Sequence, residues 1–231
     1  METNTEKDRV VLIDKPLHWT SFDVVAKMRT PLRKVFGKAV KIGHAGTLDP
    51  LATGLLIICI GKMTKQIESF QAQEKEYTGT ITLGKTTPSY DLETAFDSEA
   101  PYEHISESDI INATKQFTGE ISQIPPKFSA VKVDGKSAYL AARKGKDIEI
   151  KAKNVIIYAF EITEIVLPNV HFRVKCSKGT YIRSLAHDLG QVLQCGAHLS
   201  ALRRTKIGDF DVQNAVSPEM WVEKFKAENS I

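Results

Sequence analysis

Cysteine is scarce in this sequence, with three among 231 residues. They stand at positions 59, 176 and 195 without a CxxC pair, so the sequence predicts neither a disulfide framework nor a zinc ribbon. Long apolar runs are also missing: the longest, residues 55–60, has six residues, against the roughly 20 needed to span a bilayer. The polar residues 1–9 do not form the apolar segment of a signal peptide. We therefore expect a soluble, cytoplasmic protein with no membrane partner.

The overall composition is that of an ordinary globular protein, with 42% hydrophobic and 26% charged residues. A chain of this length and composition buries a sizeable core, which excludes intrinsic disorder and a disulfide-stapled miniprotein. At roughly 150 residues per domain, the length fits one large domain or one and a half.

The net charge of +3 conceals an uneven distribution. Residues 86–123 carry eight acidic side chains and one lysine, a balance of −7. Residues 127–153 carry eight basic and three acidic side chains (+5), and residues 171–206 carry seven basic and one acidic (+6). Either basic segment alone is equally well explained as solvated surface charge. Together they favour one positive face and a polyanionic partner such as RNA.

Hydrophobic periodicity and turn signals predict a mixture of hairpins and scattered helices. We expect strands at residues 10–13, 40–42, 55–60, 77–83, 154–166 and 170–176. We expect one helix that Ser21 caps and Pro31 disrupts, and others at residues 62–70, 106–119, 139–143 and 182–194. A tight turn is expected at residues 133–136. This order favours an α+β fold around a largely antiparallel sheet.

Residues 79–86 (GTITLGKT) match the nucleotide-binding P-loop pattern GxxxxGK[ST]. That motif requires a flexible loop that wraps phosphate and then enters a helix. Here the intervening residues are strand formers, and Pro88 and Ser89 stand near where the helix would begin. The segment is therefore predicted to be a β-strand, and we expect no nucleotide cofactor.

Residues 43–54 (GHAGTLDPLATG) form a glycine-rich segment between two predicted strands. Its three glycines permit tight turns and a close approach to a bulky ligand. Asp49 precedes Pro50, which restricts its backbone to an extended conformation. A carboxylate at this position is ionised at neutral pH and suits a nucleophile or an electrostatic stabiliser. A structural Asx-turn is the alternative, and for an isolated Asp-Pro it is the more common outcome.

Residues 176–186 (CSKGTYIRSLA) predict a strand that turns through Gly179 into a helix. Tyr181 and Arg183 then stand at the helix N-terminus. An arginine in the first turn opposes the helix dipole, so it calls for a carboxylate or phosphate partner. A surface arginine remains the alternative, and no local pattern pairs Arg183 with Asp49.

Metal and cofactor signatures are missing. The six histidines show no metal-ligand spacing with one another or with the cysteines. No serine or cysteine stands in a GxSxG-type elbow. We therefore expect neither a metal nor a cofactor.

Residues 43–54 resemble the signature loop of the TruB family of tRNA pseudouridine synthases. Further segments resemble other family motifs in the family's order: 14–16 with 20–21, 75–83, 124–130, 176–190 and 202–205. The resemblance spans residues 10 to 211. It departs at His18, where family members commonly have glycine.

The resemblance implies the pseudouridine synthase fold and the isomerisation of one uridine, at position 55 in the T-loop of tRNA, to pseudouridine. It implies a flipped-out base, no cofactor, and a partner limited to the tRNA T-arm, bound by a monomer. Residues 1–231 would form one catalytic domain with a basic, thumb-like, RNA-gripping insertion at about 124–153. Many relatives continue into a C-terminal domain of the PUA type, which we expect this chain to lack.

Carried over to this sequence, the resemblance makes Asp49 the catalytic aspartate. Whether it attacks the sugar or assists elimination to a glycal stays open. Arg183 is expected to pair with Asp49 and orient it. Tyr77 is expected to stack on the target base and handle the proton at carbon 5; core packing is the alternative for a strand tyrosine.

Three further residues are expected to bind the substrate. His44 would fill the space that the flipped uridine vacates, unless it is simply a loop histidine. Tyr181 and Leu202 would line the uracil pocket, although a leucine at such a position is ordinarily a core residue. The competing hypothesis is a tRNA-binding or tRNA-folding protein without catalysis, against which the joint presence of Asp49, Tyr77 and Arg183 argues.

Overall fold

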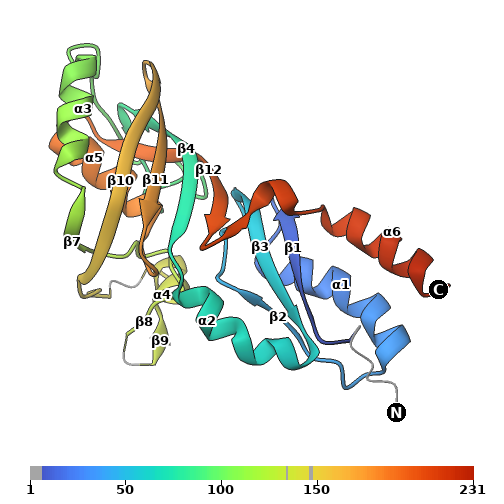
Figure 1. Cartoon of the computed structure of the whole chain (residues 1–231). Helices are drawn as coiled ribbons and strands as arrows, with labels where there is room; N and C mark the ends of the chain where they lie inside the picture. The colour runs from blue at the N-terminus through green and yellow to red at the C-terminus, as the bar shows by residue number, and fades with distance from the viewer. Residues whose placement is uncertain (1–6, 134, 146–147) are drawn as a thin grey trace. The chain divides into compact units, whose positions relative to one another are not determined.

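The computed structural model describes residues 7–133, 135–145 and 148–231. The chain divides into two compact units. The first takes in the chain up to Tyr77 and from Arg203 onward, and the second is Thr78–Leu202. The chain crosses from one unit to the other inside two strands, β4 (Lys75–Leu83) and β12 (Ala197–Ile207) (Figure 1).

The strands of the first unit are built around one long apolar segment. They are β1 (Arg9–Lys15), β2 (Ile42–Ala45), β3 (Ala52–Ile60), the end of β12, and β13 (Phe210–Asp211). Strand β3 is buried along most of its length and pairs antiparallel with β1 and β2. The strand predicted at 55–60 is confirmed and begins three residues earlier. The strand predicted at 40–42 lies too early, because residues 43–45 pair with residues 57–59.

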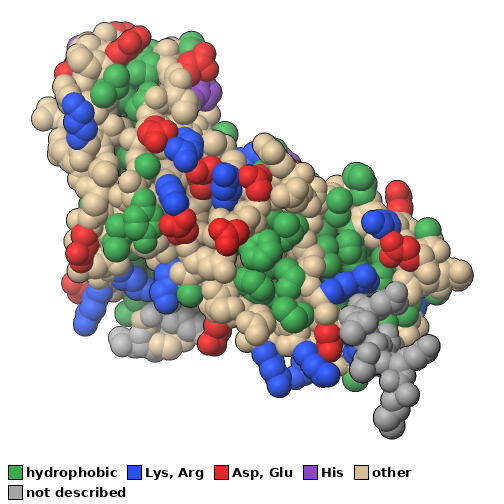
Figure 2. Space-filling model, in the orientation of Figure 1, with side chains coloured by type: hydrophobic (Ala, Val, Ile, Leu, Met, Phe, Trp, Pro, Cys, Tyr) green, Lys and Arg blue, Asp and Glu red, His purple; other side chains and the backbone are tan. Residues whose placement is uncertain are grey.

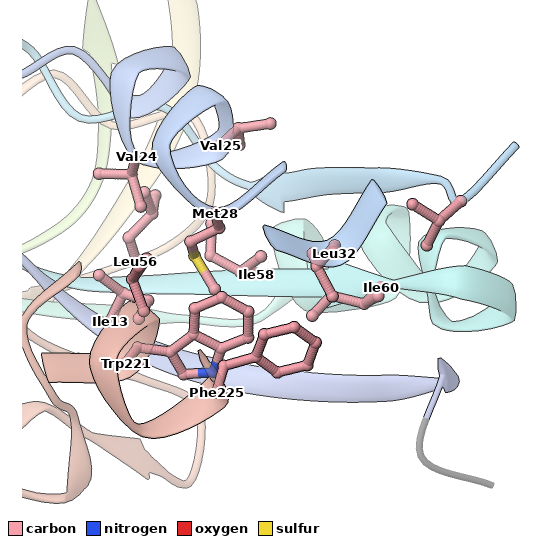
Figure 3. Close-up of a cluster of buried hydrophobic side chains, with 12 residues drawn as sticks. Ile13, Val24, Val25, Met28, Leu32, Leu56, Ile58, Ile60, Trp221 and Phe225 are labelled. Atoms are coloured by element: carbon pink, nitrogen blue, oxygen red, sulfur yellow. The ribbon is translucent and has the colours of Figure 1, made fainter. Parts of the chain in front are cut away.

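Two helices cover this sheet, α1 (Ser21–Phe36) and α6 (Pro218–Glu228). Side chains of both helices meet over β1 and β3 in one apolar cluster that includes Met28, Trp221 and Phe225 (Figure 3). Thr20, not Ser21, caps α1, because the Ser21 side chain is buried and bonded elsewhere. Pro31 does not end the helix. Leu32 and later residues continue into the core, and this packing outweighs the lost backbone hydrogen bond.

Short helical turns complete the first unit. They are the 3₁₀-helix η2 (Gly61–Gln66), α2 (Ile67–Ala72) and the 3₁₀-helix η3 (Val212–Asn214). The helix predicted at 62–70 is therefore present as a 3₁₀ segment followed by a short α-helix.

The second unit has the strand order β12-β4-β11-β10-β7. Its remaining main strands are β7 (Gly119–Gln123), β10 (Lys153–Val166) and β11 (Asn169–Cys176). Strand β10 pairs antiparallel with both β7 and β11, which confirms the predicted hairpin. Helices α3 (Glu107–Lys115) and α5 (Ile182–Val192) pack together, and α3 also packs on β10. The α+β class with a mostly antiparallel sheet is confirmed.

The segment that matches a P-loop is the strand β4. It leads into β5 (Lys85–Thr86), which pairs with β6 (Ser98–Glu99). A turn, not a helix, follows at residues 87–90. The strand prediction is confirmed, and this local structure is not that of a phosphate-binding loop.

The predicted insertion contains a small hairpin of β8 (Lys132–Val133) and β9 (Lys136–Ser137), followed by α4 (Ala138–Arg143). The helix predicted at 139–143 is confirmed. Asp134 of the predicted turn lies outside the described residues. Among the described residues, no helix combines the length and apolar character needed to cross a membrane.

Candidate active site

The loop that carries Asp49 connects β2 to β3 and is fixed at several points in the first unit. The Ala52 amide donates to the Asp49 carbonyl at 3.0 Å, and the His18 amide donates to the Pro50 carbonyl at 2.8 Å. His18 has φ +66°, in the left-handed region that favours glycine, the residue that the family resemblance leads us to expect there. Asp49 itself is half-buried. A carboxylate held in this way has a defined position and remains accessible.

Arg204 fastens both sides of this loop from within the core. Its side chain is 1% exposed, and it donates from Nε to the Leu55 carbonyl at 2.8 Å and from Nη2 to the Gly46 carbonyl at 3.0 Å. Gly54 has φ +103°, and a Cβ there would collide with the Arg204 backbone. The glycine is therefore required both by its backbone angle and by the close approach of β12.

Lys15 places a buried cation near Asp49. It is fully buried and donates to the carbonyls of Pro16 at 2.9 Å and Trp19 at 2.6 Å. The pKa of Lys15 is lowered to about 8; burial is the main cause, the negative charge of Asp49 opposes it, and the positive charge of Arg204 adds to it. At neutral pH the lysine remains charged, so its attraction to Asp49 favours the ionised form of that carboxyl group. Sequence analysis noted Lys15 only as part of a motif and missed this role.

His44 and Tyr77 also belong to the first unit. His44 lies in β2 and is half-buried; burial, followed by the positive charge of Arg204, lowers the pKa of His44. Its imidazole is therefore neutral at neutral pH. Tyr77 lies in β4 and is 9% exposed.

Tyr181 is the N-cap residue of α5 and is held by its backbone. The Tyr181 amide donates to Gln123 Oε1 at 2.8 Å, and Gln123 Nε2 donates to the Tyr181 carbonyl at 3.0 Å. Gln123 is 2% exposed, so this amide pairing fixes the start of α5 away from water. No local pattern indicated a role for Gln123.

Arg183 is buried in the first turn of α5, with 4% exposure, so it is not a surface arginine. Its Nη1 donates to the Ser89 carbonyl at 3.2 Å and lies 3.6 Å from Asp91 Oδ2. Asp91 is 5% exposed. The arginine thus has the carboxylate partner that its position against the helix dipole requires. Sequence analysis missed Asp91, which appeared only as one of eight acidic residues in the segment 86–123.

The six predicted site residues are divided between the two units. His44, Asp49 and Tyr77 belong to the first, whereas Tyr181, Arg183 and Leu202 belong to the second. Leu202 lies in β12 and is half-buried. The predicted pairing of Arg183 with Asp49 stays a prediction.

Two family models match the chain. The model of the TruB family pseudouridylate synthase N-terminal domain matches residues 33–182, more than half of the sequence. The chain belongs to the TruB family of pseudouridylate synthases. The model of the tRNA pseudouridylate synthase B C-terminal domain matches residues 183–228. The boundary between the two models falls between Ile182 and Arg183, at the start of α5.

Curated relatives of this TruB-family chain match it over nearly its whole length. The tRNA pseudouridine synthase B of Flavobacterium johnsoniae is 57% identical over 220 residues, which cover 94% of this chain and 96% of that protein. The tRNA pseudouridine synthase B of Phocaeicola vulgatus is 54% identical over 221 residues, covering 95% and 94%.

Solved structures confirm the pseudouridine synthase fold. A Cbf5–Nop10–Gar1 complex contains a chain with a TM-score of 0.72 and 32% identity, over 97% of this chain and 57% of that one. An H/ACA RNP bound to a substrate RNA containing 2′-deoxyuridine gives a TM-score of 0.69 and 29% identity, over 98% and 56%. The TruB-family chain therefore spans less than three fifths of these solved chains.

Most basic residues of the segment 171–206 are engaged internally. Arg183 and Arg204 are buried. Three others form ion pairs: Arg173 with Glu161, Arg203 with Asp14, and Lys206 with Asp211. Figure 2 accordingly shows basic and acidic side chains side by side over β4 and β11. The net charge of this segment therefore does not translate into an equally positive surface.

A cationic face that sequence analysis missed lies on α1 and the residues after it. We define it as Lys27, Arg29, Arg33, Lys34, Lys38 and Lys41, which are exposed or half-exposed. Among the described residues, none of the six forms a salt bridge with an acidic side chain. Arg29 lies over the exposed ring of Phe22, 5.3 Å from its centroid. Exposed cations without acidic partners suit a polyanion.

Within the described part of the chain, no group of three or more His, Cys, Asp or Glu side chains could hold a metal ion. The three cysteines are buried and free.

Proposed function

We propose that this TruB-family protein isomerises uridine to pseudouridine at position 55 in the T-loop of tRNA. One observation carries the proposal: a carboxylate, Asp49, lies near the buried cation of Lys15, on a loop that Arg204 holds, in a chain that is 57% identical to a tRNA pseudouridine synthase B. The alternative, a non-catalytic tRNA-binding protein, has no need of a buried lysine next to a half-exposed carboxylate.

The reaction breaks the bond from ribose C1′ to uracil N1 and forms one from C1′ to C5. C5 loses its proton and N1 gains one, so atoms and electrons balance without an oxidant, a reductant or a cofactor. Ionised Asp49 either attacks C1′ or removes the C2′ proton to give a glycal. Lys15 supports both routes, because both begin from the ionised carboxylate, and Arg204 holds the loop that carries it.

The remaining site residues act on the base and on the carboxylate. Arg183 pairs with Asp49 and is itself oriented by Asp91. Tyr77 stacks on the uracil and handles the proton at C5. Tyr181 and Leu202 line the pocket around the ring.

The target base lies inside a folded RNA loop and has to be flipped out before Asp49 reaches its ribose. Neutral His44 fills the vacated position without adding charge. The insertion at about 124–153 closes over the T-arm. The cationic face on α1 contacts phosphates, because its cations lack acidic partners among the described residues.

The test is to incubate the purified protein with an unmodified tRNA transcript and to map pseudouridine at single-nucleotide resolution. We expect pseudouridine at position 55 and at no other uridine of the T-arm. A transcript in which only this uridine is replaced by cytidine is the matched control. Tight binding with no pseudouridine would support the non-catalytic alternative instead.

A further inference from the structure

A strained turn precedes Asp91, the carboxylate beside Arg183. The Tyr90 amide donates to the Thr87 carbonyl at 3.1 Å, and Tyr90 has φ +64°, in the left-handed region. A residue with a side chain rarely takes this conformation, because its Cβ crowds the backbone. Such strain persists only where the surrounding structure holds it, and it concentrates at functional sites.

This turn directs two acceptors toward one guanidinium. Ser89 precedes Tyr90 and accepts a hydrogen bond from Arg183 Nη1 at 3.2 Å. Asp91 follows Tyr90 and places Oδ2 3.6 Å from the same nitrogen. Because only Tyr90 separates the two acceptors, its backbone angles govern the geometry of both contacts.

The ring of Tyr90 stacks on the ring of His187, with centroids 3.9 Å apart and planes at 14°. His187 follows Arg183 by four residues on α5, so both side chains lie on one face of the helix. Burial lowers the pKa of His187, and its buried Nδ1 has no hydrogen-bond partner among the described residues. The imidazole therefore contributes by packing, not by a hydrogen bond through Nδ1.

The other side of the turn is attached to β12. The Leu199 amide donates to the Tyr90 carbonyl at 2.9 Å, and Asp91 forms an isolated bridge with Leu199. The Thr87 hydroxyl donates to the Asp91 carbonyl at 2.6 Å. The backbone of this turn is thus hydrogen-bonded to β12 on one side. On the other side, the Tyr90 ring packs against α5, the helix that carries Arg183.

We propose that Tyr90 and His187 are positioning residues, whose stack holds the left-handed turn against α5 and so keeps the Ser89 carbonyl and Asp91 aligned on Arg183. This inference rests on the proposed function, in which Arg183 orients the catalytic aspartate. In this proposal neither aromatic residue contacts the substrate. They affect the reaction only through the orientation of the buried Arg183 guanidinium.

Removal of the Tyr90 ring tests the proposal. Tyr90→Gly loses the stack but accepts a left-handed backbone without strain. The single-turnover rate of pseudouridine formation on a tRNA transcript should fall roughly ten- to a hundred-fold, the scale expected when a reacting group is misplaced. Affinity for the transcript should stay within a few-fold, because phosphate contacts dominate it. Tyr90→Phe retains the stack and should restore the wild-type rate.

Phe96 provides the matched control. It lies on the same connection between β4 and α3, but packs against His198, with ring centroids 5.2 Å apart. Phe96→Ala removes an aromatic ring of similar size and should leave the rate unchanged. The same test is made on the other ring: His187→Ala should lower the rate as Tyr90→Gly does, and His187→Phe should retain the wild-type rate. If circular dichroism shows that Tyr90→Gly is unfolded, the two His187 variants test the proposal in its place.

Coupling to Asp91 separates positioning from general stability. In an Asp91→Asn background, Tyr90→Gly should lower the rate little further, since both changes act on Arg183. Fully additive losses would overturn the inference, as would a wild-type rate in Tyr90→Gly and His187→Ala. If the wild-type protein forms no pseudouridine, the proposed function itself is overturned and this inference with it.

Discussion

Ser21 and Leu48 exchange two hydrogen bonds across 27 residues of sequence. The Ser21 hydroxyl accepts from the Leu48 amide at 2.8 Å and donates to the Leu48 carbonyl at 3.2 Å. Ser21 is the first residue of α1, and Leu48 directly precedes Asp49. The N-terminal end of a core helix is therefore tied to the loop that carries the proposed catalytic carboxylate.

Ser21→Ala removes both bonds and leaves two buried backbone groups of Leu48 without this partner. We expect the free energy of unfolding to fall by about 1–3 kcal/mol. We also expect a lower single-turnover rate, because the backbone before Asp49 loosens. Chemical denaturation and rate measurements check this. Ser69→Ala, which removes an exposed serine bonded to Gln66, is the control and should change neither quantity.

Asp49→Asn should abolish pseudouridine formation while tRNA affinity stays within a few-fold, because phosphate contacts dominate affinity. Asparagine keeps the size of the side chain but is neither a nucleophile nor a base. Asp209→Asn, on an exposed turn, is the charge-matched control and should retain the wild-type rate. Measurable turnover by an Asp49→Asn preparation free of wild-type enzyme would reduce Asp49 to a structural role.

Arg183→Ala strands Asp91 as a buried charge, and we expect a loss of about 3–5 kcal/mol in stability. Arg183→Lys should fold better yet remain slow, because a single ammonium group does not reproduce the planar geometry of the guanidinium. Thermal unfolding and turnover of both variants check this. Arg173→Lys, in the exposed pair with Glu161, is the control and should change neither stability nor turnover appreciably. A fully active Arg183→Lys would contradict the proposed role.

Asp188 makes stability depend on pH. Burial raises the pKa of Asp188 from 3.8 to about 6. The folded protein thus binds this proton more tightly than the unfolded chain, so its contribution to stability declines as pH rises from about 4 to about 6. Asp188→Asn should stabilise the protein at pH 7 by at most about 3 kcal/mol, an advantage that shrinks toward pH 4.

Denaturation of the wild type, Asp188→Asn and the exposed Glu219→Gln over this pH range tests the prediction. A pH-independent difference between Asp188→Asn and the wild type would refute it.

The cationic face predicts a change in salt dependence. Replacing Arg29, Arg33 and Lys34 with glutamine should weaken tRNA binding and reduce the slope of log affinity against log salt by about 0.7–0.9 for each lost phosphate contact. The control replaces Lys224 and Lys226, exposed on α6, in the same way. Filter-binding measurements of tRNA affinity between low and moderate salt compare the slopes of the two variants. An unchanged slope would mean that these cations face only solvent.

Local sequence pattern was sufficient for much of the secondary structure. The hairpin of β10 and β11, the strand β4 behind the P-loop pattern, and the position of Asp49 between two strands were all predicted. Each depends on alternation, turn residues or capping groups within a few positions of one another. The predicted disruption at Pro31 was wrong, because the local cost of the proline is outweighed by tertiary packing of α1, which a local pattern does not contain.

The surroundings of the site residues were decided by the tertiary structure. Arg204 reaches the carbonyl of Gly46 across 158 positions, and Arg183 reaches that of Ser89 across 94. The sequence motifs contain these arginines, but they do not indicate which groups the arginines contact. The sequence determined which groups are present and which local backbone carries them. Only the packed core brought them together and removed water, because a buried charge is tolerated solely where distant acceptors converge on it.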